Sequence, residues 1–413
     1  MPLTSHPGVC RLAVLASHPI QYFTPIYRHL AAVPGLAVQV WYCRDFGVRP
    51  HFDRQFGRAV QWDTDQLEGY DYRFLSNISP IRDVFNPLHA INPGALTGMF
   101  QGYDALWVNG YVYPSNWLAA LGAWLTGAKL LFRSDLRTET ATPTGLRSIF
   151  RDVLRRGWIS HSDGLLYIGH SNRQAYVAYG ADERQLFPTP YSVDVDAISD
   201  AVRRAADNRR ELRARWSVPE QATVVLFVGK LTPRKHPEAL LHIAAKSPDL
   251  HFVVAGSGPL EDLLVAEAKR TCSSNVSFLG FVNQSQLPDV YALSDIFVMP
   301  SEREPWGLVL NEAMAARLPA VVSRDVGAVP DLIIEGETGF TFPMGDWDAM
   351  AALVRRLATD VQLRRQIGDA ASRRAQLFTF AATADGIVEA LRALGVYKAD
   401  DTAARPEEPS ADC

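Results

Sequence analysis

The sequence is most informative at Glu304-Pro305-Trp306-Gly307-Leu308-Val309-Leu310-Asn311-Glu312. Two carboxylates stand eight positions apart, separated by a proline–aromatic–glycine break and an apolar run that predicts the start of a helix. Glu304 falls in the loop before this helix and Glu312 falls inside it. The first turn of a helix has unpaired backbone N–H groups and a partial positive charge, which suit a phosphate. The flanking carboxylates can accept hydrogen bonds from hydroxyls, so the pattern predicts a ligand with a diphosphate between two sugars.

The length and composition of the chain fit two globular domains. The chain has 413 residues, which suits two domains of about 200 residues each. Its net charge of -4 argues against a nucleic-acid partner. The cysteines have neither disulfide nor metal-ligand spacing, which fits a reducing compartment. No apolar run approaches the ~20 residues that span a bilayer, and no signal peptide is visible, so we expect a cytoplasmic protein.

Two series of alternating apolar and amphipathic segments predict an α/β protein with two doubly wound, Rossmann-like parallel sheets. The strands expected in the first series are 11–16, 37–43, 104–108, 129–132 and 164–168. Those expected in the second series are 223–228, 251–255, 276–279, 296–299 and 320–322. We expect a charged helix at 200–216, and an insertion or long loop with some short strands at 44–86.

We assign the domains to residues 1–195 and 196–378, with a disordered tail at 398–413. In open α/β sheets, ligands bind beyond the carboxyl ends of the strands. Two such domains facing one another across a cleft therefore suit a reaction between a donor on one side and an acceptor on the other.

A basic loop follows the strand that ends at Val228, with the sequence Gly229-Lys230-Leu231-Thr232-Pro233-Arg234-Lys235. Lys230 and Lys235 can converge on one diphosphate and stabilise the negative charge that develops on a departing nucleoside diphosphate. The alternative interpretation is a solvated basic loop without a ligand.

These motifs resemble the retaining glycosyltransferases of family 4, also called glycosyl transferases group 1, which have the GT-B fold and a pair of glutamates separated by seven residues. The basic loop is similar to the family's G-R-L-x-x-x-K loop, although Lys230 stands where arginine is usual and lacks its bidentate fork. The likeness extends to Ser294-Asp295-Ile296-Phe297-Val298-Met299-Pro300-Ser301 upstream and to Ala313-Met314-Ala315, Leu318-Pro319-Ala320-Val321-Val322, Gly327-Ala328-Val329-Pro330-Asp331 and Gly336-Glu337-Thr338-Gly339-Phe340 downstream.

The resemblance implies that Lys230, Lys235 and Glu304 are the catalytic residues, with Glu304 bonded to hydroxyls of the donor sugar and Glu312 to the ribose. It implies that backbone N–H groups meet the phosphates, at Gly307, Leu308 and Val309. The alternative is a carboxylate favoured by the helix dipole together with a solvated helical glutamate. Glu302 competes with Glu304 for the first role, but its spacing to Glu312 is wrong. The resemblance also implies that the last helix, at 379–394, crosses back onto the first domain.

Residues 255–259 read Ala-Gly-Ser-Gly-Pro after a strand and invite a dinucleotide-binding interpretation, but no glycine occupies position 261. The resemblance instead makes Gly256 and Gly258 a close-approach turn beside the nucleotide, with Phe281 and Val282 near the base.

The stretch Asp194-Val195-Asp196 imitates a metal-binding D-x-D motif, but it lies at the domain junction and we reject it. No other cluster has metal-ligand spacing. Fixed lysines and a helix terminus can replace a divalent cation, so we expect no metal and no cofactor.

The first domain has fewer signals. His18 follows the first strand, in a loop where many relatives have a glycine pair, and it contacts acceptor or phosphate or is a structural loop histidine. Arg133 and Asp135 follow the strand at 129–132, where relatives often place a histidine near the sugar. We assign these three residues to the acceptor or sugar side.

A basic amphipathic helix is expected at 146–158, with four arginines and an apolar face. Such a helix can lie on an anionic membrane on its cytoplasmic side, which would bring a lipid-linked acceptor within reach. The alternative is a helix with one core face and one solvated face.

Together these features predict a retaining glycosyltransferase that moves a hexose-type sugar from a nucleoside-diphosphate sugar to a hydroxyl of a saccharide, lipid-linked or small-molecule acceptor. The product would be a polysaccharide, a glycolipid or a glycosylated metabolite. Two alternatives remain at this point. One is a nucleotide-sugar epimerase or phosphorylase of the same architecture, although nothing marks the cofactor lysine of a phosphorylase. The other is a non-catalytic nucleotide-sugar sensor.

Overall fold

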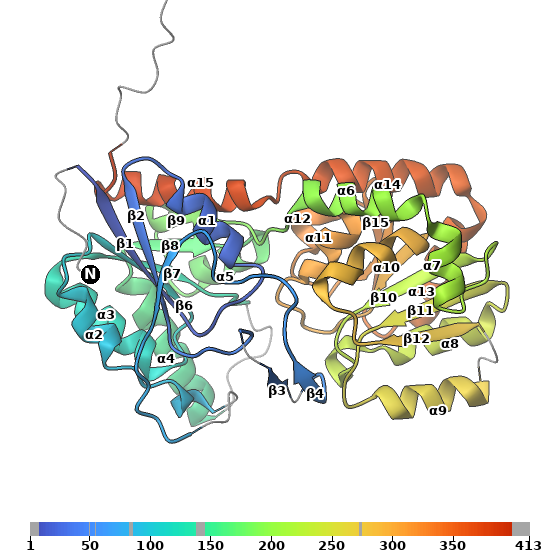
Figure 1. The fold of residues 1–413 in the computed structure, drawn as a ribbon, viewed down its shortest axis with the longest axis horizontal. Coiled ribbons are helices and arrows are strands. Elements are labelled where there is room, and N and C mark those ends of the chain that lie inside the picture. The colour runs from blue at the N-terminus through green and yellow to red at the C-terminus, as the bar shows by residue number, and fades with distance from the viewer. Residues whose placement is uncertain are drawn as a thin grey trace, which may run out of the picture.

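The computed structural model describes residues 8–48, 50–53, 55–81, 86–137, 145–271 and 275–398. Within these residues the chain forms two parallel β-sheets, each covered by helices, that stand next to one another (Figure 1). The prediction of two doubly wound α/β units is confirmed. The predicted tail at 398–413 lies outside the described residues except for its first residue.

In the described part of the chain, the first sheet has seven strands in the order β5-β2-β1-β6-β7-β8-β9, all parallel. Its strands are β1 (Cys10–Ala16), β2 (Leu36–Tyr42), β5 (Asp71–Phe74), β6 (Ala105–Asn109), β7 (Lys129–Arg133), β8 (Gly164–Tyr167) and β9 (Leu186–Pro188). The helices of this half are α1 (Thr24–Ala31), α2 (Gly94–Met99), α3 (Pro114–Thr126), α4 (Leu146–Ser160) and α5 (His170–Ala178), with short 3-10 helices at Pro87–His89 and Glu183–Gln185. The middle residues of the central strands β1, β6 and β7 are apolar, as expected for strands with both faces buried.

The second sheet, counted over the same described residues, has six strands in the order β12-β11-β10-β13-β14-β15. Its strands are β10 (Thr223–Val228), β11 (Leu250–Ala255), β12 (Val276–Gly280), β13 (Ile296–Met299), β14 (Ala320–Ser323) and β15 (Gly339–Phe342). The helices that follow Pro188 are α6 (Val195–Ala206), α7 (Arg209–Arg215), α8 (Glu238–Lys246), α9 (Glu261–Thr271), α10 (Leu287–Leu293), α11 (Leu308–Ala315), α12 (Val329–Leu332), α13 (Trp347–Thr359), α14 (Val361–Ala375) and α15 (Phe380–Ala393), with 3-10 helices at Pro233–Lys235 and Gln284–Gln286.

The single helix predicted at 200–216 is wrong, because two helices, α6 and α7, occupy this stretch. The break falls at Asp207 and Asn208, two residue types that favour caps and turns over helix interiors. Helix α6 begins earlier than expected because the Asp194 side chain caps it, accepting a hydrogen bond from the Ala197 N–H at 3.0 Å. This cap gives Asp194 a structural role at the domain junction.

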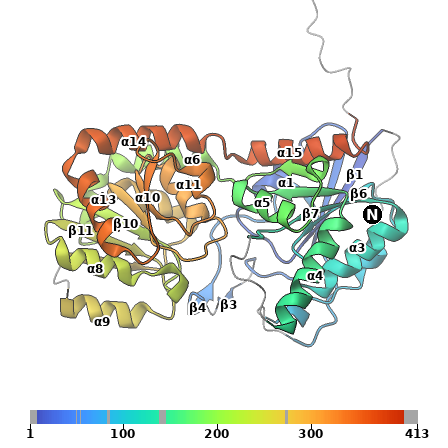
Figure 2. The ribbon, with the colours of Figure 1, turned by 180° about the vertical axis from the view of Figure 1, so that it is seen from behind.

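Helix α15 crosses from the second sheet back to the first, where it lies beside α1 and β9 (Figures 1 and 2). Its residues Phe380, Ile387 and Leu391 share an apolar core with β1 and β2. Gly386 allows this approach, since a Cβ there would stand 1.8 Å from the carbonyl oxygen of Pro188. The last helix therefore completes the core of the first domain.

The stretch 44–86 contains an antiparallel hairpin, formed by β3 (His51–Asp53) and β4 (Arg58–Val60), and the edge strand β5. The hairpin leaves the first domain and lies in the region between the two sheets (Figure 1). Within the described residues, no helix is both long enough and apolar enough to cross a membrane.

Candidate active site

A cavity of about 470 Å³ opens where β10 and β11 end, and we call it the lysine cavity. It collects residues from both halves of the chain. Those predicted from the sequence to belong to a site are His18, Lys230, Lys235, Gly256, Phe281, Val282 and Val309. Those that the sequence analysis missed include Gln21, Tyr22, Asp53, Gln55, Phe56, Trp62, Arg234 and Gln284.

The two lysines of the basic loop enter this cavity but hold different partners. Lys235 Nζ donates to Glu304 Oε2 at 2.6 Å, and Arg234 stands 3.7 Å from the same oxygen. Lys230 Nζ donates to Gln55 Oε1 at 2.7 Å and Asp53 Oδ2 at 3.2 Å. Burial lowers the pKa of Lys230, and the Asp53 carboxylate acts in the opposite direction by raising it. The nearby Lys235 charge also lowers the pKa of Lys230, so the two ammonium groups act on one another within the same cavity.

Glycines set the close spacing beside this loop. Gly256 has a φ of +146°, and a Cβ on it would stand 1.9 Å from the carbonyl oxygen of Gly229. A Cβ on Gly258 would stand 2.6 Å from the backbone oxygen of Leu231. Only Gly256 of the predicted pair lines the lysine cavity, so Gly258 serves to pack the turn against the basic loop.

Helix α11 begins directly after Gly307, whose φ of +98° suits glycine. The first turn directs Val309 to the lysine cavity, whereas Gly307 and Leu308 are not among the residues that line it. Glu304 precedes this turn and is buried, with 8% of the residue's surface exposed. Its carboxylate accepts a hydrogen bond from Lys235. Glu302, the competing candidate, faces a second cavity.

The second glutamate of the pair, Glu312, is buried, and each of its carboxylate oxygens accepts one hydrogen bond. Its Oε1 accepts a hydrogen bond from the Tyr22 hydroxyl at 2.9 Å, and its Oε2 accepts one from the Tyr291 hydroxyl at 2.6 Å. Burial raises the pKa of Glu312. It lines a separate cavity of about 290 Å³ rather than the lysine cavity. Because Tyr22 follows β1, this hydrogen bond joins the two domains.

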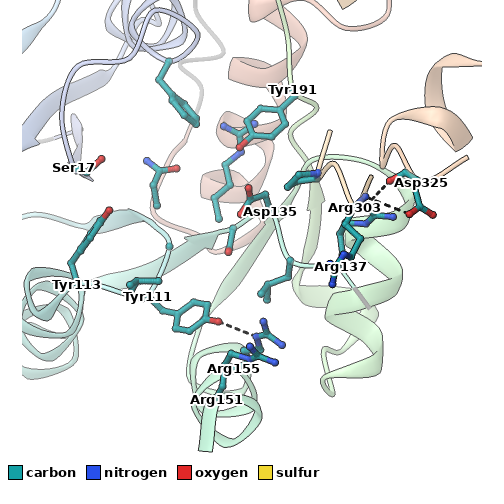
Figure 3. Close-up of a pocket in the computed structure, with 18 of the residues that line it drawn as sticks. Ser17, Tyr111, Tyr113, Asp135, Arg137, Arg151, Arg155, Tyr191, Arg303 and Asp325 are labelled. Carbon is teal, nitrogen blue, oxygen red and sulfur yellow. Dashed lines mark hydrogen bonds between the residues drawn. The ribbon is translucent and has the colours of Figure 1, made fainter. Parts of the chain in front are cut away.

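A larger cavity, of about 1250 Å³, lies beyond the carboxyl ends of β6 and β7, and we call it the arginine cavity (Figure 3). Its lining includes Asn109, Tyr111, Tyr113, Arg133, Asp135, Arg137, Arg151, Arg155, Tyr191, Glu302, Arg303 and Asp325. Asp135 and Tyr191 stand on one side of it, and Arg151 and Arg155 of α4 stand at another (Figure 3).

Of the residues predicted for the acceptor side, Arg133 and Asp135 line the arginine cavity. Arg133 is buried, donates to the Thr189 carbonyl at 2.9 Å, and lies 4.8 Å from the ring centre of Tyr191. The surface of Asp135 is exposed, and we attribute this exposure to the open space of the arginine cavity, because protein surrounds the carboxylate on its other sides. Burial raises its pKa, and the nearby Glu304 charge adds to this effect.

Two short stretches of the chain connect residues of the two cavities. Ser17 lines the arginine cavity and His18 the lysine cavity, and the Ser17 Oγ and His18 Nδ1 atoms are 2.9 Å apart. In the second stretch, Arg303 and Pro305 line the arginine cavity, while the Glu304 side chain between them turns to Lys235. Glu304 itself is bonded to Lys235 of the lysine cavity, and its neighbours in the chain line the arginine cavity. Across the described ranges, no cluster of three or more His, Cys, Asp or Glu residues could hold a metal ion.

Comparison with known proteins identifies the family. Residues 208–374 match the family model described as glycosyl transferases group 1. A D-inositol 3-phosphate glycosyltransferase of Streptomyces bingchenggensis is 30% identical over 330 residues, covering 72% of this chain and 70% of that protein. An alpha-D-kanosaminyltransferase of Streptomyces kanamyceticus is 33% identical over 49% of this chain and 53% of its own length. For several of these curated relatives, the match spans about half of their length.

Solved structures confirm the fold. Anabaena HepE in complex with UDP has a TM-score of 0.70 at 16% identity and covers 93% of this chain and 100% of its own. A glycosyltransferase from Rickettsia africae has a TM-score of 0.71 at 16% identity, covering 94% of this chain and 99% of its own. The predicted GT-B arrangement of two doubly wound domains is therefore confirmed. The family-model match and the Streptomyces bingchenggensis relative show that the chain belongs to the glycosyl transferases group 1.

Proposed function

We propose that this protein transfers a hexose-type sugar from a nucleoside-diphosphate sugar to an acceptor hydroxyl, with retention of the anomeric configuration. The donor occupies the lysine cavity and the acceptor occupies the arginine cavity. One observation carries this proposal: two ammonium groups line a cavity beside the first turn of α11, and Glu304, which is bonded to one of them, lies between two residues that line a second cavity.

The lysine cavity suits a donor in size and chemistry. Its volume of about 470 Å³ lies within the range of small-ligand sites, about 300–1,000 Å³. The diphosphate would meet Lys230, Lys235 and the N-terminal turn of α11. The sugar would then point toward Glu304, whose carboxylate accepts hydrogen bonds from its hydroxyls.

In the proposed reaction, the bond between the anomeric carbon and the phosphate oxygen breaks while the acceptor oxygen attacks from the same face. The acceptor proton passes to the leaving phosphate oxygen, so no enzymic nucleophile is needed. Lys230 and Lys235 stabilise the charge that builds on the departing diphosphate. Since these cations are fixed by the protein, we propose that transfer requires no divalent metal and no cofactor.

The acceptor is proposed to be a saccharide, a lipid-linked saccharide or a small hydroxyl-bearing molecule. The arginine cavity supports this because its wall offers both guanidinium and carboxylate groups, including Arg303 and Asp135. A relative named for D-inositol 3-phosphate transfer supports a small polyol among the acceptors to be tried first.

The test begins with thermal-shift measurements on the full chain with UDP, GDP, ADP and dTDP sugars, followed by the stabilising donor with a panel of acceptors. We expect a glycoside whose anomeric configuration by NMR equals that of the donor, formed equally well in EDTA. Conversion of the donor without an acceptor would favour an epimerase. Tight donor binding with no product across the panel would favour a sensor, and activity restored only by a divalent cation would contradict the metal-free mechanism.

We also propose that α4 lies on an anionic membrane, so that a lipid-linked acceptor reaches the arginine cavity from the cytoplasmic side. Three apolar side chains of this helix are exposed, Ile149 by 52%, Phe150 by 64% and Val153 by 60%. Arg151 on the same helix lines the arginine cavity. An apolar face beside basic residues suits the boundary between acyl chains and anionic headgroups.

This membrane proposal predicts that the wild-type protein cosediments with phosphatidylglycerol vesicles and less with phosphatidylcholine vesicles. The double variant Ile149→Ser/Phe150→Ser is expected to lose this binding while keeping the donor-induced thermal shift. Leu263→Ser is the matched control, because Leu263 is 66% exposed on α9 of the other domain. Equal cosedimentation of the double variant and the wild type would refute a docking role for α4.

A further inference from the structure

The hairpin β3–β4 belongs to the first domain but forms a wall of the lysine cavity. Its contacts reach across to the second domain at three separate places. Asp53 and Gln55 hold Lys230, the Ser257 hydroxyl donates to the Phe56 carbonyl at 3.1 Å, and the Asn283 amide donates to the Gln61 carbonyl at 2.9 Å. These contacts connect the insertion to the basic loop, the glycine turn and the segment after β12.

Three aromatic rings meet where this hairpin touches the second domain. The Phe56 and Phe281 ring centres are 5.2 Å apart and nearly perpendicular. Trp62 lies 6.3 Å from Phe281 and 6.4 Å from Phe56. All three line the lysine cavity and are partly exposed to it. Aromatic faces of this kind stack on nucleobases irrespective of base identity.

The hairpin also supplies an anionic partner to Lys230, the carboxylate of Asp53. Burial disfavours the charged ammonium, and Asp53 opposes this effect. The Lys230 ammonium also lies 4.5 Å from the ring centre of Phe56. A diphosphate would bring more negative charge to the same ammonium, and Asp53 would then repel it.

We propose that the hairpin is a donor-binding element, in which Phe56 and Trp62 pack the nucleobase against Phe281 and Asp53 holds Lys230 until the diphosphate replaces it. This inference rests on the proposed function, since it takes a nucleoside diphosphate as the ligand. It adds residues of the first domain to the donor site. Phe56 and Trp62 are binding residues, and Asp53 is a positioning residue that acts through Lys230.

If a diphosphate replaces Asp53 as the partner of Lys230, removing the Asp53 charge should raise the affinity for that diphosphate. In Asp53→Asn, the side-chain carbonyl can still accept a hydrogen bond from Lys230, but the negative charge that would repel a phosphate is gone. We therefore expect Asp53→Asn to bind the nucleoside diphosphate about two- to five-fold more tightly, the range of a partly exposed ion pair, with the affinity for the parent nucleoside unchanged. A merely structural Asp53 would leave both affinities alone or weaken both.

The aromatic residues give the second arm of the experiment. Phe56→Ala and Trp62→Ala are each expected to lower the affinity for the nucleoside diphosphate and for the nucleoside by about ten-fold, because each loses one stacking contact. Phe52→Ala is the control, since Phe52 is 65% exposed on the same hairpin and does not line the cavity. Its affinities should equal those of the wild type.

The measurement is isothermal titration of the full chain with whichever of UDP, GDP, ADP and dTDP stabilises it most, and with the matching nucleoside. Unchanged affinities in Phe56→Ala and Trp62→Ala would overturn the role of the aromatic residues. Unchanged or weaker diphosphate binding by Asp53→Asn would overturn the exchange at Lys230. Failure of the wild type to bind any of the four would instead overturn the proposed function itself.

Discussion

Replacing Lys235 with alanine is expected to lower kcat by about two to three orders of magnitude, the usual effect of removing one fixed donor to a developing oxyanion. The Lys235 ammonium is the closer of the two cations beside Glu304, at 2.6 Å from Oε2. Its removal takes a cation from the departing diphosphate and leaves the Glu304 carboxylate with Arg234 alone at 3.7 Å. Glu304→Gln should also lower kcat, because the amide oxygen can still accept from Lys235 but lacks the negative charge that holds the ammonium and binds the donor hydroxyls.

The measurement is single-turnover transfer with the donor found by thermal shift, together with the melting temperature of each variant. Lys246→Ala is the control: Lys246 is an exposed lysine on α8 that pairs with Asp348. We expect it to keep wild-type turnover. If Lys235→Ala melts like the wild type and keeps its turnover, Lys235 has no part in catalysis.

Gly256→Ala is expected to weaken donor binding strongly and to destabilise the fold by about 1–3 kcal/mol, the usual cost of overpacking or of strained backbone. Gly256 has a left-handed φ of +146°, and the new methyl group would stand 1.9 Å from the Gly229 carbonyl oxygen. The glycine turn and the basic loop must separate, which moves Lys230 away from the cavity.

The effect is checked by urea unfolding and by titration with the nucleoside diphosphate. Gly157→Ala is the matched control, since Gly157 lies inside α4 with nothing within 4 Å of the added methyl group. There the change should stabilise the protein by about 0.5–1 kcal/mol, because alanine favours a helix. Wild-type stability and affinity in Gly256→Ala would show that the turn relaxes without moving the loop.

The sequence predicted the core strands well and the short edge elements poorly. β10 and β13 were expected with their observed bounds because each is a continuous apolar run closed by polar residues. β9 has three residues and β5 has four, too short to show a period of their own. Their strand conformation depends on neighbours in the sheet, such as the pairing of Tyr42 with Phe74.

Within the candidate site, the motifs that follow strands of the second domain could be found from sequence, and the contacts between domains could not. Lys230 and Lys235 stand out in their loop, but nothing local marks Asp53, which is 177 positions from Lys230. Tyr22 lay in the stretch after the first strand, and its bond to Glu312 spans 290 positions. The sequence predicts that Glu312 bonds ribose hydroxyls, but it does not show that two tyrosine hydroxyls donate to its oxygens.

The return of α15 to the first sheet has a consequence for biosynthesis. Leu12 and Val14 of β1 share a core with Ile387 and Leu391 of α15, so β1 is covered by a helix that is synthesised much later. Contacts between residues so distant in sequence form slowly, because the closure of a long loop precedes them. Until that helix is synthesised, the nascent first domain exposes an apolar sheet face, and aggregation and chaperone binding compete with its folding.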